Sequence, residues 1–218
     1  MEKMNGQLEK FRDIHHGERA FIVGSAPSIL NLDLSKLDGD ILFGSNRIYL
    51  YYPALPAVKY YSIGDRSCLS KISNDRQAGC RVDDVGTVFC RSAGFDNVID
   101  DLGWIADHPE AVPYVIDGEI CDRGFCLEQP RHGWSITHES IWLALWMGCD
   151  PLYVIGVDCQ YPPGSVGERC FNRDKAVISH RKIREWCDKN GRRIFNAGFK
   201  GSLDVYERVY FNSIFGGH

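Results

Sequence analysis

The sequence lacks several features that would assign it to particular classes of protein. It has no run of five like charges and a net charge of only −4, which argues against nucleic acid as the main partner. Its longest apolar stretch, residues 141–148, is too short to cross a bilayer. It contains no internal repeat or low-complexity segment. What remains is an ordinary globular composition, with 44% hydrophobic and 25% charged residues, so we expect one domain over residues 1–218.

The cysteines indicate a reducing environment. The chain has nine of them, an odd number, and no secretory signal precedes them, so we expect no disulfide framework. Cys90 and Cys149 lie in apolar runs, where a free thiol packs as a small hydrophobic group. Cys121 and Cys126 have no second pair at zinc-site spacing, so no metal site is expected. The expected localisation is cytoplasmic.

Short apolar runs that end abruptly in small or polar residues recur along the chain. Continuous hydrophobicity, rather than alternation, is typical of strands covered on both faces by helices. The runs predict strands at residues 20–23, 41–43, 60–63, 87–90, 112–116, 152–155 and 193–195. The predicted fold is therefore α/β and Rossmann-like, with a mostly parallel central sheet and helices on both faces.

Three helices are expected between and before these strands. Residues 1–17 predict a short polar helix, residues 137–148 a central buried helix, and residues 173–189 an outer amphipathic helix. Residues 67–84 and 118–133 lack periodicity, which favours loops over a site.

Polar or small residues that follow the predicted strands are the first candidates for a site. In an open parallel sheet, ligands bind outside the carboxyl ends of the strands, near the point where the strand order reverses. Helix amino termini there offer unpaired amide donors to anions such as phosphate. The candidates are Gly24, Ser25, Asn46, Asp65, Ser92, Asp117, Asp158 and Asn196. For Ser92 and Asp117 a plain turn is an equal alternative, because turns favour the same residue types.

The first turn, Gly24-Ser25-Ala26-Pro27-Ser28, is the sharpest of these candidates. It has only one glycine and is followed by no Gly-Lys-Ser/Thr, so it matches neither the dinucleotide fingerprint nor the P-loop. Its small side chains would let the backbone approach a phosphate closely, and Pro27 would fix the bend. A binding role is therefore favoured over a plain turn.

The ordered segments resemble a known family. Residues 17–29 and 43–50 contain the first turn and the run Gly44-Ser45-Asn46-Arg47-Ile48-Tyr49. They resemble the bacterial family described as 6-hydroxymethylpterin diphosphokinase MptE-like, which shows Gly-Asn-Gly-Pro-Ser and Gly-x-Asn-Arg-Ile-Tyr at this spacing. Segments further along match in order, so the likeness covers nearly the whole chain. The main departure is Ser25-Ala26 in place of Asn-Gly.

The same segments resemble, more distantly, the single-domain bacterial sialyltransferases, which use a CMP-sugar donor without an essential metal. This resemblance implies that Ser25 and Asn46 contact the donor's phosphate or sugar. It also implies that Ser135 contacts the sialyl carboxylate or phosphate, and that Gly156 lines the nucleotide pocket. The remaining donor-binding candidates are Gly24, Ala26, Pro27, Ser28, Asp65, Thr137 and Asp158.

A sugar hydroxyl must lose its proton as it attacks, and a histidine is an efficient acceptor near neutral pH. In the sialyltransferases a histidine near the start of a later helix is the base. By helix register Asp174 takes that place here, and the nearest histidine is His180. His180 and His138 are the candidate general bases, and His132 is a third.

Charged residues leave the donor chemistry open. Arg169, Arg173 and Lys175 would stabilise a pyrophosphate leaving group, although a solvated loop explains them equally. Asp65 and Asp158 would hold magnesium if the donor is ATP, whereas a carboxylate bonded to a ribose hydroxyl would need no metal.

The leading hypothesis is a transferase that moves a sialic-acid-like sugar from a CMP donor to a glycan, with no cofactor required. The alternatives are an ATP- and magnesium-dependent diphosphokinase acting on 6-hydroxymethyl-dihydropterin, and a nucleotide-binding protein without turnover. The expected partners are thus a nucleotide-activated donor and a glycan or pterin acceptor. Aromatic residues around 49–52 also suggest a homo-oligomer contact, although core packing is favoured over it.

Overall fold

The computed structural model describes residues 2–51, 54–64, 86–93, 111–160 and 172–216. These residues form one sheet of eight strands in the order β5-β4-β3-β2-β1-β6-β7-β8, and every neighbouring pair is parallel. The strands are β1 (Ala20–Val23), β2 (Ile41–Ser45), β3 (Tyr60–Ile63), β4 (Thr87–Ala93), β5 (Val112–Val115), β6 (Leu152–Ile155), β7 (Ile194–Asn196) and β8 (Glu207–Arg208). The predicted α/β, Rossmann-like class is confirmed.

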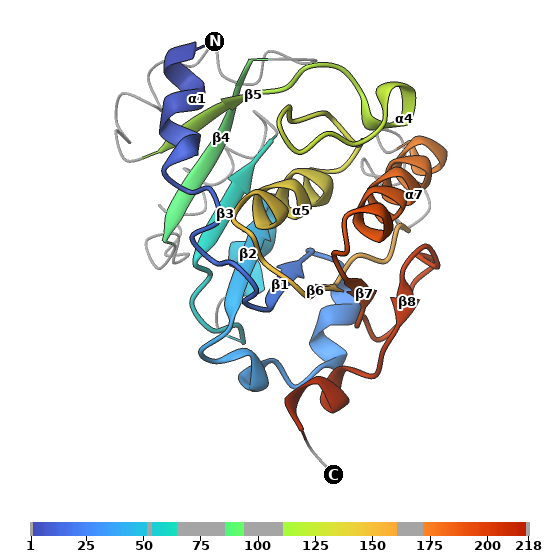
Figure 1. Ribbon diagram of the computed structural model, residues 1–218. Coiled ribbons are helices and arrows are strands. Elements are labelled where there is room, and N and C mark those ends of the chain that lie inside the picture. The colour runs from blue at the N-terminus through green and yellow to red at the C-terminus, as the bar shows by residue number, and fades with distance from the viewer. Residues whose placement is uncertain (1, 52–53, 65–85, 94–110, 161–171, 217–218) are drawn as a thin grey trace.

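The strand order reverses between β1 and β6. From β1 the chain builds outward through β2, β3, β4 and β5, and then returns to place β6 on the other side of β1 (Figure 1). Because all pairs are parallel, the carboxyl ends of the strands share one edge. The reversal therefore places the β1 and β6 ends where ligands bind in folds of this type.

Helical segments cover both faces of the sheet. On one face lie α5 (Ile136–Trp146) and α7 (Arg173–Lys189), side by side in Figure 1, and α1 (Glu2–Glu9) lies beside β5. The other face packs against short 3-10 helices: η1 (Pro27–Asn31), η2 (Leu34–Leu37), η3 (Asn46–Tyr51) and η4 (Phe211–Phe215). Alternate residues of β1 serve the two layers, because Ile22 faces α5 while Phe21 faces the 3-10 helices.

Helix α5 is the centre of the core. Ser135 caps it, accepting a hydrogen bond from the Thr137 amide, and every residue from Thr137 to Trp146 is buried. At its other end the amides of Asp13, His15 and Gly17 donate to the carbonyls of residues 146–148. The amino-terminal segment thus satisfies the carbonyl groups that the end of a helix leaves unpaired.

The predicted elements agree with the structure except in their boundaries and in the shortest elements. The central helix begins one residue before the predicted start and α7 spans residues 173–189 as predicted, whereas the amino-terminal helix is shorter than residues 1–17. The 3-10 helices and the two-residue β8 were not predicted, and α4 (Ile120–Arg123) lies within the predicted loop 118–133. The predicted loop 67–84 lies outside the described residues.

Truncation of the α5 core should cost far more stability than truncation of an exposed apolar residue of the same type. Leu143 is completely buried, whereas Leu30 is 59% exposed. We expect L143A to lower the free energy of unfolding by about 2–5 kcal/mol and L30A by less than about 0.5 kcal/mol. Urea denaturation of the two variants measures the difference, and equal losses would contradict the described packing.

Candidate functional site

Two glycine backbones meet where the strand order reverses. The Gly24 amide donates to the Ile155 carbonyl at 2.8 Å, and the Ala26 amide donates to the Gly156 carbonyl at 3.0 Å. A Cβ on Gly24 would overlap the carbonyl oxygen of Gly156, and a Cβ on Gly156, whose φ is +62°, would overlap that of Gly24. The loops after β1 and β6 therefore touch through their main chains, at the point where folds of this type bind ligands.

Ser28 and Asp158 lie together beside the glycine contact. The Ser28 hydroxyl donates to Asp158 Oδ1 at 2.5 Å, and the Tyr51 hydroxyl donates to the Ser25 carbonyl at 3.1 Å. Burial and the charge of Asp158 raise the pKa of Tyr51. Ser25 is exposed. Of the predicted donor-binding residues, the structure thus brings together Gly24, Ser25, Ala26, Pro27, Ser28, Gly156 and Asp158.

Asn46 and the start of α5 lie further along the same edge. Asn46 follows β2 with a φ of +48°; its carbonyl accepts from the Tyr61 hydroxyl, and its side-chain oxygen accepts from the Gly64 amide at 3.3 Å. Ile136, in the first turn of α5, packs so closely on Gly64 that a Cβ there would lie 2.5 Å from its Cδ1. Ser135 and Thr137 therefore lie near the end of β3, with their hydroxyls 3.1 Å apart. Asp65 lies outside the described residues.

His138 and His180 form a buried pair between α5 and α7. Their ring centroids are 4.0 Å apart and neither side chain is exposed. His138 contacts the Ser135 and Ala176 carbonyls, and His180 Nδ1 lies 2.8 Å from the Tyr206 hydroxyl. His180 is thus no surface residue of an outer helix. Direct contact of either ring with a substrate would require the helices to separate, and the general-base assignment of both stays a prediction.

A buried ion pair that was not predicted lies under the first turn of α5. Arg91 of β4 donates to Glu139 through Nη2, and through Nε at 3.4 Å, and the Tyr114 hydroxyl donates to the same carboxylate. The sequence did carry a signal for each of these two charges, although not for their pairing. Arg91 directly follows the predicted apolar run 87–90, and Glu139 is the only acidic residue of the buried helix α5. Buried charges of opposite sign in neighbouring elements are expected to pair.

Glu119, Cys121 and Asp122 are close enough together to be considered as metal ligands, but their contacts oppose this. Glu119 accepts hydrogen bonds from Lys175 at 3.0 Å and from Trp134 at 2.8 Å. Burial, Glu119 and Asp122 raise the pKa of the Cys121 thiol to about 11, so the thiolate that a metal needs is disfavoured. Lys175, predicted to face a pyrophosphate, is thus engaged by Glu119.

Asn196 lies close to the glycine contact, because its side chain bonds the Leu203 carbonyl and the Gly198 amide, and a Cβ on Gly198 would lie 3.9 Å from the Gly156 nitrogen. Asp117 instead contacts Arg123 and Gln129 on the surface. Asp174 and Arg173 are exposed at the start of α7. Arg169 lies outside the described residues, and the structure describes no side chain for Ser92.

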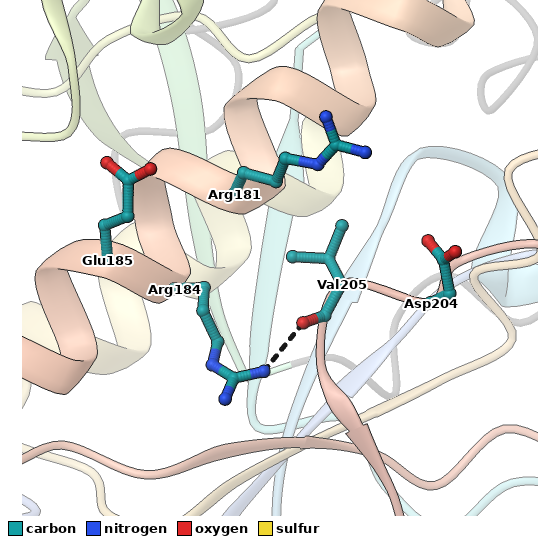
Figure 2. A pocket seen from close by; sticks show the side chains of 5 residues that line it. All are labelled: Arg181, Arg184, Glu185, Asp204 and Val205. Carbon is teal, nitrogen blue, oxygen red and sulfur yellow. Dashed lines mark hydrogen bonds between the residues drawn. The ribbon is translucent and has the colours of Figure 1, made fainter.

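A hollow of about 340 Å³ opens on the outer side of α7. Figure 2 shows that Arg181, Arg184 and Glu185 line it from the helix, while Asp204 and Val205 line it from the segment before β8. The Arg184 guanidinium donates to the Val205 carbonyl at 2.8 Å. None of these residues is among the predicted site residues.

Comparison with known proteins identifies the fold. No family model and no curated protein matches the chain, so the MptE-like resemblance gains no support. The sialyltransferase CstII from Campylobacter jejuni, solved with the substrate analogue CMP-3FNeuAc, matches with a TM-score of 0.55 over 88% of this chain and 85% of that chain, at 13% identity. The α-2,3-sialyltransferase from Campylobacter jejuni, in apo form, matches with a TM-score of 0.52 over 88% and 83%, at 14% identity. The chain has the fold of these enzymes.

Among its described helices, none has the length and apolarity that a bilayer crossing needs.

The glycine contact predicts opposite effects of alanine at two positions. We expect G24A to destabilise the fold by about 1–3 kcal/mol, because its methyl group would overlap the Gly156 carbonyl. Gly6 is an exposed position of α1 with nothing near its absent side chain, so G6A should stabilise by about 0.5–1 kcal/mol. Chemical denaturation of both variants tests this, and a neutral G24A would show that the loops do not touch.

The histidine pair predicts that stability falls in mild acid. Burial lowers the pKa of His138 to about 4, and burial with the neighbouring His138 lowers the pKa of His180 well below its usual value. The unfolded chain therefore binds more protons as pH falls below about 6.5, and each such proton costs about 1.4 kcal/mol per pH unit. We expect the unfolding free energy of the wild type to drop more between pH 6.5 and 5 than that of H180F. Parallel slopes in the two proteins would contradict the burial of His180.

Proposed function

We propose that the chain is a glycosyltransferase that takes a sialic-acid-like sugar from a CMP donor and transfers it to a glycan acceptor. One observation carries the proposal: the loops after β1 and β6 contact each other through the backbones of Gly24 and Gly156, with a carboxylate and hydroxyls directly beside them. The fold shared with two sialyltransferases supports it. A shared fold alone does not define an activity, so the proposal depends on the chemistry of this site.

The site offers separate groups for the parts of such a donor. The Ser25 amide would face the phosphate, because Ser25 is exposed and the amides of Gly24 and Ala26 already donate to the Ile155 and Gly156 carbonyls. Asp158 would accept hydrogen bonds from ribose hydroxyls, exchanging its bond from Ser28 for bonds to the ligand. Asn46, Ser135 and Thr137 would contact the sugar, since they lie along the same edge beside Gly64.

No step in this reading needs a metal. Asp158 accepts a hydrogen bond from Ser28 and would accept others from ribose hydroxyls without a cation. A monophosphate leaving group carries less charge than a pyrophosphate, so amide and hydroxyl donors suffice to stabilise it. The ATP- and magnesium-dependent diphosphokinase reaction would instead place both carboxylates on a cation.

Ligand-induced stabilisation tests the proposal. We expect CMP to raise the melting temperature equally with and without magnesium, because a ligand that binds only the folded state stabilises it by mass action, by about 2.7 kcal/mol at 100 times its Kd. D158N should weaken CMP binding by about tenfold through the loss of charged hydrogen bonds. D117N is the matched control, since Asp117 also follows a strand but contacts Arg123 on the surface.

CDP, UDP, GDP and ATP, each with and without magnesium, complete the panel. A shift with magnesium-ATP alone would replace the proposal with the diphosphokinase reaction. Binding of CMP without release of CMP from CMP-sialic acid would leave a nucleotide-binding protein without turnover. No shift with any nucleotide would reject all of these functions.

A further inference from the structure

The loop that follows β7, residues 197–202, lies against the loop that follows β6. A Cβ on Gly198 would lie 3.9 Å from the Gly156 nitrogen, and a Cβ on Gly201 would lie 2.6 Å from Asp158 Cα. We call residues 197–202 the β7 loop. Two of its positions are therefore in close contact with residues of the candidate site.

Hydrogen bonds fix the main chain of the β7 loop. The Asn196 side chain, one of the predicted strand-end groups, donates to the Leu203 carbonyl at 2.7 Å and accepts from the Gly198 amide at 2.9 Å. Arg208 of β8 donates to the Gly198 carbonyl at 2.8 Å. Because the loop is held from both ends, it has little conformational entropy left to lose when a ligand binds to it.

Phe199 lies within this loop and exposes its ring. The residue is 59% exposed, and it stands between Gly198 and Gly201, the two positions that contact the β6 loop. A single exposed apolar side chain is ordinary on a protein surface and indicates nothing by itself. Its place at the edge of the site is what gives this one a meaning.

The strand order gives the site edge three successive positions. β1, β6 and β7 are parallel neighbours in the sheet (Figure 1), and neighbouring strands lie about 4.8 Å apart. Ser25 follows β1, Asp158 follows β6 and Phe199 follows β7. A nucleoside monophosphate likewise consists of a phosphate, a ribose and a base, joined in that order. With its phosphate at Ser25 and its ribose at Asp158, its base comes to lie at the β7 loop.

We propose that Phe199 is the platform on which the base of the nucleotide donor stacks. The inference rests on the proposed function, from which the places of the phosphate and the ribose are taken. An aromatic ring stacks on the flat face of any base, so Phe199 contributes affinity for the nucleotide and not the choice of cytosine. Asn196 is a positioning residue, because its side chain fixes the main chain next to Phe199.

Binding of two ligands to F199A tests the assignment. We expect F199A to weaken CMP binding, measured by calorimetry, by about 5–100-fold, as the loss of an aromatic platform for a base does. F199W keeps a stacking surface and should bind CMP within about twofold of the wild type. Ribose 5-phosphate has the phosphate and the ribose but no base. Its affinity, measured by ligand-detected NMR, should therefore be the same in F199A and the wild type.

I14A is the matched control for the removal of an exposed apolar side chain. Ile14 is 44% exposed, but it lies before the start of β1, at the opposite edge of the sheet. I14A should therefore bind CMP as the wild type does. Equal losses of affinity for CMP and ribose 5-phosphate in F199A would show that the ring only supports the loop, and would overturn the inference. Wild-type affinity of F199A for CMP would also overturn it.

Fluorescence of F199W reports the stacking contact directly. An indole ring that stacks on a nucleobase loses fluorescence, and the wild type already has five tryptophans. The quenching by CMP is therefore compared among the wild type, F199W and I14W. We expect CMP to quench F199W more strongly than the wild type, and I14W to respond as the wild type does. Equal quenching in all three proteins would contradict a base placed at the β7 loop.

Failure of the inference and failure of the proposed function give different results. A wild type that binds no CMP rejects the proposed function, and the inference falls with it. A wild type that binds CMP, together with a weakened D158N and an unchanged F199A, rejects the inference alone.

Discussion

The contact between Gly24 and Gly156 is the constraint on which the site depends. Two neighbouring parallel strands, β1 and β6, end in loops that approach until no side chain fits between them. This approach determines where Ser28 meets Asp158 and where the turn after β1 exposes Ser25. A binding site made largely of backbone loses little entropy on ordering, since it has few side-chain rotamers to restrict.

The first turn of α5 connects this backbone contact to the charged interior. Ser135 and Thr137 lie at the amino end of α5. His138 contacts the Ala176 carbonyl of α7, and Glu139 accepts a hydrogen bond from Arg91 of β4. A buried ion pair rarely adds stability by itself, because desolvation offsets its attraction. Here its Arg91 guanidinium lies beside Gly64, at the end of β3.

Much of the fold could be predicted from the sequence because strands covered on both faces leave a plain signal. Runs such as Phe21-Ile22-Val23 end where the structure ends the strand, and the residues after them lie at one edge as the topology requires. The largely apolar α5 and the amphipathic α7 could be predicted for the same reason. The 3-10 helices and β8 were not, because two to six residues carry no measurable period.

The site could be predicted only in part. Residues adjacent to strands, such as Ser28 and Asp158, came together because strand order alone determines their place. The charged sequence around His180 is typical of a surface helix, but the His180 side chain is buried, because it lies on the face of α7 that packs against α5 and Tyr206. The Arg91–Glu139 pair joins elements 48 positions apart, and local patterns cannot show which distant partner a charge will meet.

The order in which these parts appear during synthesis has a consequence for the nascent chain. Ser28 and Asp158 are 130 positions apart in the sequence. Of the two strands that pair with β1, β2 is synthesised soon after it and β6 much later. The Asp13–Gly17 segment likewise cannot bond the end of α5 until that helix has been made. Translation therefore leaves one edge of β1 unpaired until β6 has left the ribosome, and unpaired strand edges favour association with other chains during that interval.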